Sequence, residues 1–346
     1  MITGLAAAGV VVLGIYVGSR RLKDFDTALV SYAAATVFSA FGLAYRGSLW
    51  ISRPPTRLYW RRGWQLFFAP RRLPGNLLHL GRLVGSSLIA QRFIKRRSTL
   101  RWAAHACISW GCVLAAAVTF PLSFGWIRFE TPLDSQEIYH AYVFGVLVLR
   151  FPLASPIAPL VFNVLSISAA MVIAGVFLSL WRRARDRGER AVQELAGDLL
   201  PLILLFAIAS TGVLLTISTH FLRGFHYIFL SQFHAVTVIF TLLYLPFGKF
   251  FHIFQRPTQL SLDFYKRAGA AGPQARCARC DEPFASSMHV EDLKTVQAEL
   301  GIRYRLAGAK HYQDVCPPCR RKNLALLQDG LWQAARHKAV TAPKES

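Results

Sequence analysis

Long runs of apolar residues, separated by short polar and basic stretches, fill the first three quarters of the chain. Each run is long enough, or nearly so, to cross the hydrocarbon layer of a bilayer as a helix. The runs are Ile2–Gly18, Thr27–Tyr45, Trp102–Ile127, Pro152–Trp181, Leu199–Phe221 and Tyr227–Phe251. After Pro257 the chain becomes polar and charged. The pattern predicts an all-α membrane protein, with a transmembrane helix bundle at residues 1–257 and a small soluble domain at residues 258–346.

The number of spans depends on how the first two runs are interpreted. Arg20, Arg21 and Lys23 lie between them. In a topology with six spans this basic cluster lies on the outer side, against the preference of Lys and Arg for cytoplasmic loops. The two runs can instead form one span and a re-entrant or interfacial piece. The sequence therefore predicts five or six spans.

A block of basic residues separates the second run from the third. Between Arg46 and Arg101 the chain has thirteen Arg and Lys residues and no Asp or Glu. Because the positive charge lies between apolar runs in a chain that is 53% hydrophobic, it favours a cytoplasmic loop in contact with anionic lipid headgroups and argues against nucleic acid as a partner. Within the block, Gly75–Arg97 predicts an amphipathic surface helix. The expected location is the inner (cytoplasmic) cell membrane, with the C-terminus in the cytoplasm.

Two histidines, His234 and His252, lie eighteen residues apart in or next to the last apolar run. Eighteen residues are five turns of a continuous helix, so both rings are expected on one face, roughly 27 Å apart. Ionisable side chains inside a membrane are costly and usually functional, and imidazole is a common axial ligand of haem iron. His105 in the third run is expected at the depth of His252, so the two can bind one haem between helices. Outer-side candidates to partner His234 are His140 and His220.

These histidine segments resemble a known family. The segment His234–Pro257, HAVTVIFTLLYLPFGKFFHIFQRP, resembles the last helix of the respiratory nitrate reductase gamma subunit and of related membrane cytochromes of heterodisulfide-reductase complexes. The segment His105–Pro121, HACISWGCVLAAAVTFP, is similar to the other ligand helix of that family. The resemblance implies that His105 and His252 hold a haem b on the cytoplasmic side. The family has a second histidine further along the earlier helix, where this chain has Ala115. The resemblance therefore leaves open whether the chain binds one haem or two.

The resemblance also implies a function. It suggests a membrane b-type cytochrome subunit that passes electrons between the quinone pool and a cytoplasmic oxidoreductase, with an iron–sulfur subunit and a molybdopterin-type catalytic subunit as partners. The chain itself has no catalytic constellation, so it is expected to be an electron-transfer subunit with quinone as its substrate. Lys249 is a candidate for contact with the quinone or a haem propionate, or is a topology anchor. A membrane-tethered zinc-ribbon adaptor without redox function and a small-solute transporter are the alternatives.

The C-terminal segment contains two Cys-x-x-Cys motifs. Paired motifs of this spacing are typical of a tetrathiolate metal site, and the reducing cytosol disfavours disulfides. We expect zinc in a closed tetrahedral site, with iron in a rubredoxin-like site as the alternative. The predicted ligands are Cys277, Cys280, Cys316 and Cys319.

Overall fold

In the computed structural model the chain is described over residues 1–132, 137–302 and 311–341. The fold is mostly helical and divides into two compact units. Unit 1 comprises Met1–Leu49 and Gly81–Pro257, and unit 2 comprises Trp50–Leu80 and Thr258–Ser346. Part of the basic block thus belongs to the same unit as the C-terminal segment. The division of the chain at residue 257 stays a prediction.

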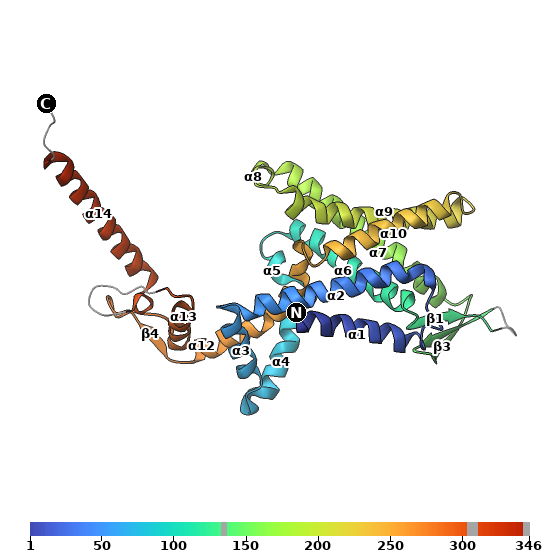
Figure 1. The fold of residues 1–346 in the computed structure, drawn as a ribbon, viewed down its shortest axis with the longest axis horizontal. Coiled ribbons are helices and arrows are strands. Elements are labelled where there is room, and N and C mark those ends of the chain that lie inside the picture. Colours follow the sequence, from blue (N-terminus) through green and yellow to red (C-terminus); the bar gives the residue numbers. More distant parts are fainter. Residues whose placement is uncertain (133–136, 303–310, 342–346) are drawn as a thin grey trace. The chain divides into compact units, whose positions relative to one another are not determined.

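Among the described residues, five helices are long and apolar enough to cross a membrane (Figure 1). The chain is therefore a multi-pass membrane protein, and the predicted fold class of a helical membrane bundle with five or six spans is confirmed. The first helix, α1 (Ile2–Gly18), is apolar but has only 17 residues. The five are α2 (Val30–Ser52), α6 (Thr99–Ser123), α7 (Ile157–Arg185), α9 (Leu200–Phe221) and α10 (Tyr227–Tyr244). A short helix directly precedes two of them, namely η1 (Thr27–Leu29) before α2 and η4 (Leu195–Leu199) before α9.

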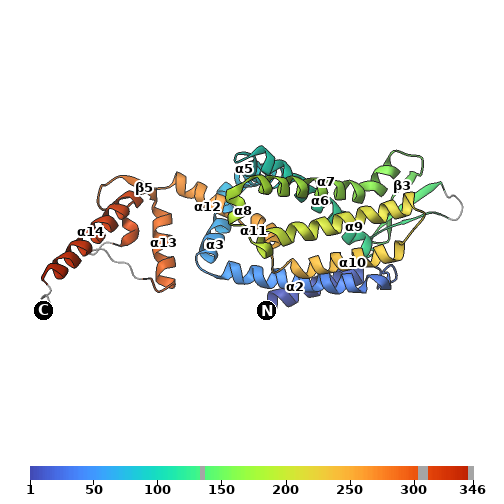
Figure 2. The same ribbon diagram turned by 90° about the horizontal axis from the view of Figure 1, so that it is seen from above.

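The last four membrane helices pack against one another in chain order. Helix α6 contacts α7, α7 contacts α9, and α9 contacts α10, and Figure 2 shows α7, α9 and α10 running roughly parallel. The short helix α8 (Arg187–Ala191) follows α7. Glycines let α6 and α7 approach closely, because a Cβ atom on Gly175 would lie 2.7 Å from the carbonyl oxygen of Ala104. Small residues are the usual means of close helix contact in membranes.

The last membrane helix is shorter than predicted. Helix α10 ends at Tyr244, and the chain then turns through Pro246 into η5 (Lys249–Phe251) and α11 (His252–Thr258). A proline has no backbone N–H, and its ring clashes with the preceding turn of a helix. The prediction of one continuous helix that carries His234 and His252 on the same face is therefore wrong.

One face of α2 supports this turn. The hydroxyl of Ser39 donates a hydrogen bond to a carbonyl in the last turns of α10. A Cβ atom on Gly42 would lie 2.8 Å from Pro246, so α2 and the turn are in close contact. The guanidinium of Arg46 donates to the carbonyls of Pro246 and Phe247 at 2.5 and 2.9 Å. The guanidinium thereby satisfies two carbonyls that the helix break exposes, and unpaired backbone groups are costly within a membrane.

Between α6 and α7 the chain forms an antiparallel sheet that the apolar pattern did not predict. Its strands are β1 (Ile127–Glu130), β2 (Ile138–Val143) and β3 (Val146–Pro152), with β2 in the centre. The two-residue turn between β2 and β3 consists of Phe144 and Gly145, with φ values of 50° and 82°. Positive φ at both central residues suits the tight turn that matches strand twist.

The basic block is largely helical. It contains α3 (Thr56–Phe67), η2 (Pro70–Arg72), α4 (Leu73–Leu83), the π-helix η3 (Val84–Ile89) and α5 (Arg92–Lys95). The single amphipathic helix expected over Gly75–Arg97 is thus not observed, because Gln91 adopts a left-handed backbone conformation with φ of 49° and interrupts it.

Unit 2 is organised around the packing of α3 on α12 (Leu260–Ala271). A Cβ atom on Gly63 would lie 2.3 Å from the carbonyl oxygen of Ser261, and the rings of Phe67 and Phe264 have centroids 4.9 Å apart. The remaining elements are β4 (Gln274–Arg276), β5 (Pro283–Ser286), α13 (Ser287–Glu299), η6 (Tyr312–Asp314) and α14 (Pro317–Thr341).

Candidate functional site

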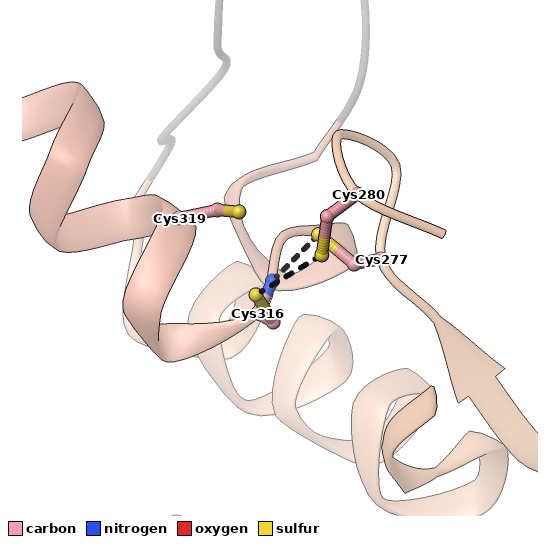
Figure 3. A group of neighbouring side chains, drawn as sticks. All are labelled: Cys277, Cys280, Cys316 and Cys319. Atoms are coloured by element: carbon pink, nitrogen blue, oxygen red, sulfur yellow. Dashed lines mark hydrogen bonds between the residues drawn. The ribbon is translucent and has the colours of Figure 1, made fainter. Parts of the chain in front are cut away.

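Four cysteines of unit 2 gather around one point (Figure 3). They are Cys277, Cys280, Cys316 and Cys319. Their Sγ atoms all lie within 4.8 Å of one another, and those of Cys280 and Cys316 are 3.8 Å apart. Thiolates at about 2.3 Å from a tetrahedral zinc ion lie roughly 3.8 Å from one another. The cluster can therefore bind a metal ion such as zinc, as the two motifs predicted.

Both motifs lie at the ends of secondary-structure elements. Cys277 directly follows β4 and Cys280 precedes β5, so the first pair occupies the turn of a β-hairpin. In that turn Asp281 has a φ of 58°, which lets the chain reverse within a few residues. Cys316 directly precedes α14, and Cys319 lies in its first turn. The spacing of two residues within each motif therefore directs both thiols of a pair toward the same point.

Backbone N–H groups prepare one thiol for ionisation. The N–H groups of Arg279 and Cys316 point at the Cys277 Sγ atom, with N···S distances of 3.4 and 3.2 Å. Burial opposes ionisation of Cys277, but these donors and the N–H of Cys280 lower its pKa to about 6. The pKa of Cys319 is raised to about 12, first by its contact with the Cys316 thiol and then by burial. A cation must therefore displace protons from the cluster when it binds.

In unit 1 the structure brings His105 and His252 together. His105 lies in α6 and His252 is the first residue of α11. Their ring centroids are 6.3 Å apart and their ring planes make an angle of 64°. Both side chains are partly buried. The turn at Pro246, rather than a continuous helix, directs the chain so that His252 meets His105.

The Nδ1 atom of each ring is occupied by a hydrogen bond. Nδ1 of His105 lies 2.8 Å from the side-chain oxygen of Gln91, and Nδ1 of His252 lies 2.6 Å from the carbonyl oxygen of Lys249. A carbonyl oxygen only accepts, so each Nδ1 carries the proton and donates it. In a neutral ring the lone pair is then on Nε2. Metal-binding histidines are generally held in this way, with the second nitrogen hydrogen-bonded to the protein.

His234 has a separate environment. Its Nδ1 atom lies 2.8 Å from the hydroxyl of Thr211, which itself donates to the carbonyl of Ala207 at 2.7 Å. The hydroxyl thus lies between Nδ1 of His234 and a backbone carbonyl of α9, and it fixes the position of the ring. His140 lies in β2 and His220 is exposed in the last turn of α9. Across the described ranges, no hydrogen bond or ring contact joins either of them to His234, and their predicted role stays untested.

Lys249 connects two segments of unit 1. Its ammonium group forms an ion pair with the carboxylate of Asp198 in η4, and its carbonyl oxygen accepts the hydrogen bond from His252. Asp198 also lies 3.9 Å from the guanidinium of Arg183 at the end of α7. The lysine therefore ties the segment that holds His252 to the start of α9. The predicted contact with a quinone or propionate stays a prediction.

No family model matches this chain, and no curated protein or solved structure matches it either. The resemblance of the two histidine segments to a cytochrome family is therefore carried by those segments alone.

Two residues that contact ring nitrogens were missed in the sequence. Gln91 lies in the basic block, and Thr211 lies within an apolar run. The only signal in the sequence is that each is an uncharged polar residue within or beside apolar residues. Such residues serve helix packing in membranes as well as hydrogen bonds between helices, so this signal does not distinguish the two roles.

Proposed function

We propose that the chain is a membrane b-type cytochrome subunit that binds haem b between His105 and His252 and exchanges electrons with the quinone pool. The separation of the two rings is the observation on which the proposal rests. Two imidazoles that bind one iron, each through a nitrogen at about 2 Å, have ring centres roughly 6 Å apart. The observed 6.3 Å fits this requirement. The two rings would hold an iron through Nε2 at any angle between their planes, so 64° is compatible with the proposal.

The surrounding residues also fit. Gln91 and the Lys249 carbonyl hold the Nδ1 proton of each ring, so both rings offer Nε2 to a metal. A bound haem b would supply one-electron chemistry. The role of the chain is to fix the separation and orientation of the rings. Arg46 and the other residues of α2 that hold the turn at Pro246 contribute to this by positioning His252.

The number of haems depends on whether His234 is a ligand of a second haem. Its ring is held through Nδ1 by the Thr211 hydroxyl, which leaves Nε2 for a metal. A second haem needs a second ligand, and His140 and His220 are the proposed partners. The ratio of haem to protein distinguishes one haem from two. If the chain binds two haems, replacement of His234 lowers the ratio from about two to about one. If it binds one haem, the ratio stays at about one.

The proposed partners rest on the resemblance of His105–Pro121 and His234–Pro257 to the cytochrome family. They are a quinone as substrate, with Lys249 near it, and an iron–sulfur subunit and a molybdopterin-type catalytic subunit on the cytoplasmic side. The thirteen Arg and Lys residues of the basic block support the proposed orientation in the inner membrane with the C-terminus in the cytoplasm, because Lys and Arg prefer cytoplasmic loops.

The test is a pyridine haemochrome assay and a reduced-minus-oxidised spectrum of the full chain purified from haem-supplemented cells. We expect a b-type spectrum that is lost in His105→Ala and in His252→Ala. His226→Asn is the matched control, because this exposed histidine has a φ of 53° and asparagine tolerates that conformation. A wild-type protein without haem, or an unchanged spectrum in His252→Ala, overturns the proposal.

The cysteine cluster favours a second function, a membrane-tethered adaptor whose cytoplasmic unit is stabilised by zinc and has no redox role. The approach of four thiols to within 4.8 Å of one another is the observation that favours it. Elemental analysis of the full chain distinguishes the two functions. The adaptor contains zinc and no haem iron, whereas the cytochrome contains haem iron with zinc or iron in the cysteine cluster.

A further inference from the structure

Gln91 occupies an unusual position beside the histidine pair. The residue is buried, with 6% of its surface exposed, and its backbone is left-handed with φ of 49° and ψ of 39°. This conformation is uncommon for residues other than glycine, and such residues cluster at functional sites. Gln91 lies between η3 and α5, at the point where the surface helix expected from the sequence is interrupted.

Two tryptophans of α6 hold the chain immediately before Gln91. The indole N–H of Trp102 donates to the carbonyl of Ala90 at 2.8 Å, and that of Trp110 donates to the carbonyl of Ile89 at 3.4 Å. The two indoles lie on either side of His105 along α6. The contacts satisfy carbonyls at the end of η3 and fix the position of Gln91 relative to this helix.

The hydrogen bonds around the Gln91 amide determine its orientation. The hydroxyl of Ser109 donates to the carbonyl of Ala106 at 3.3 Å, so it accepts from the Gln91 side-chain nitrogen at 2.6 Å. The amide oxygen then faces Nδ1 of His105 at 2.8 Å. Because this oxygen only accepts, the proton of the His105 ring is on Nδ1 and its lone pair is on Nε2.

We infer that Gln91 is a positioning residue that fixes the tautomer and orientation of His105 for metal ligation. The inference rests on the proposed function and extends it to a residue outside the ligand set. A hydrogen bond to the second nitrogen of a ligand imidazole raises its basicity and holds its ring in place. A carboxylate at this position makes the ring a stronger donor and stabilises ferric iron, whereas an apolar side chain leaves the ring unsupported.

The test compares Gln91→Leu, Gln91→Glu and Ser109→Ala with Gln232→Leu, a matched control at an exposed position of α10. We expect Gln91→Leu to weaken haem binding by roughly 10–100-fold, the usual loss when such a partner is removed. Gln91→Glu keeps the haem and lowers its midpoint potential. Ser109→Ala lets the amide rotate away from His105. The ring then becomes a weaker donor, and the midpoint potential rises, as it does for the haem that Gln91→Leu retains.

Two outcomes overturn the inference separately from the proposed function. If wild-type protein binds haem and both Gln91 variants match Gln232→Leu in affinity and midpoint potential, Gln91 has no positioning role. The tautomer can also be read without haem from the ¹⁵N NMR shifts of histidine-labelled full-length protein, with His105 assigned by its loss in His105→Ala. A wild-type His105 protonated on Nε2, or an unchanged tautomer in Gln91→Leu, excludes the inference whether or not haem binds.

Discussion

The contact between α6 and α7 allows a sharp prediction about Gly175. A Cβ atom at this position would lie 2.7 Å from the carbonyl oxygen of Ala104 and 2.9 Å from the backbone nitrogen of Ile108. Ordinary van der Waals contact begins at 3.4 Å, so the methyl group of Gly175→Ala is about 0.7 Å too close to a backbone atom. Backbone atoms cannot rotate away as the end of a flexible side chain can.

The consequence is that α6 and α7 must separate or bend. Overpacking of this kind costs about 1–3 kcal/mol in the free energy of unfolding. The two backbone atoms belong to the helical turn from Ala104 to Ile108, which contains His105. We therefore expect Gly175→Ala to reduce both the stability of the protein and, under the proposed function, the amount of haem it retains.

Chemical unfolding of the detergent-solubilised full chain, followed by tryptophan fluorescence, measures the change. Gly111→Ala is a second test of the same interface, because its Cβ atom would lie 2.7 Å from Val172 and 2.8 Å from the carbonyl of Ser168. Gly9→Ala is the control, since nothing lies within 4 Å of its Cβ position. If Gly175→Ala unfolds at the same denaturant concentration as Gly9→Ala, the close packing of α6 on α7 is wrong.

Three more predictions concern other parts of the chain. Cys277→Ser lowers the content of zinc or non-haem iron in the full chain, measured by elemental analysis after subtraction of the haem iron, from about one ion to near zero because one of four thiolate ligands is lost; Cys107→Ser in α6 does not. Gly63→Ala destabilises unit 2 by about 1–3 kcal/mol, since its Cβ atom would lie 2.3 Å from a backbone oxygen of α12, and limited proteolysis becomes faster than in Gly75→Ala, which has open space. The pKa of Asp24 is lowered, first by its hydrogen bond to the arginine four residues earlier. Its ionised form therefore stabilises the fold above the unfolded-state pKa of about 3.9. This contribution is lost as the pH falls through the lower folded-state pKa, and a thermal melt of Asp24→Asn against pH lacks that loss.

The sequence predicted the features that depend on residues close together in the chain. A span is recognised from a run of apolar residues whose length matches the membrane, and each of the five candidate spans overlaps a predicted run. The cysteine cluster follows from two motifs in which Cys-x-x-Cys directs both thiols of a pair to one side, as seen for Cys277 and Cys280. Only the contact between the two motifs depends on the fold. Because both motifs favour the same kind of metal, the sequence already suggested that they bind one ion together.

Features that depend on distant contacts could not be predicted. The docking of α3 on α12 places Gly63 against Ser261, two residues nearly two hundred positions apart. In the sequence the same segment is indistinguishable from a basic loop, because its arginines dominate the hydropathy pattern. The sheet between α6 and α7 was missed for a different reason, since its strands have only 4, 6 and 7 residues and carry no regular alternation of buried and exposed positions.

The break in the last membrane helix shows why the histidine geometry needed the structure. Proline is tolerated within membrane helices, so Pro246 alone does not decide between a kink and an end. The outcome depends on whether a neighbour can satisfy the carbonyls that the break exposes. Arg46 does so from α2, 200 residues earlier in the chain. The proximity of His252 to His105 therefore depends on the contacts that α2 makes with the Pro246 turn, and the eighteen-residue spacing of His234 and His252 does not determine it.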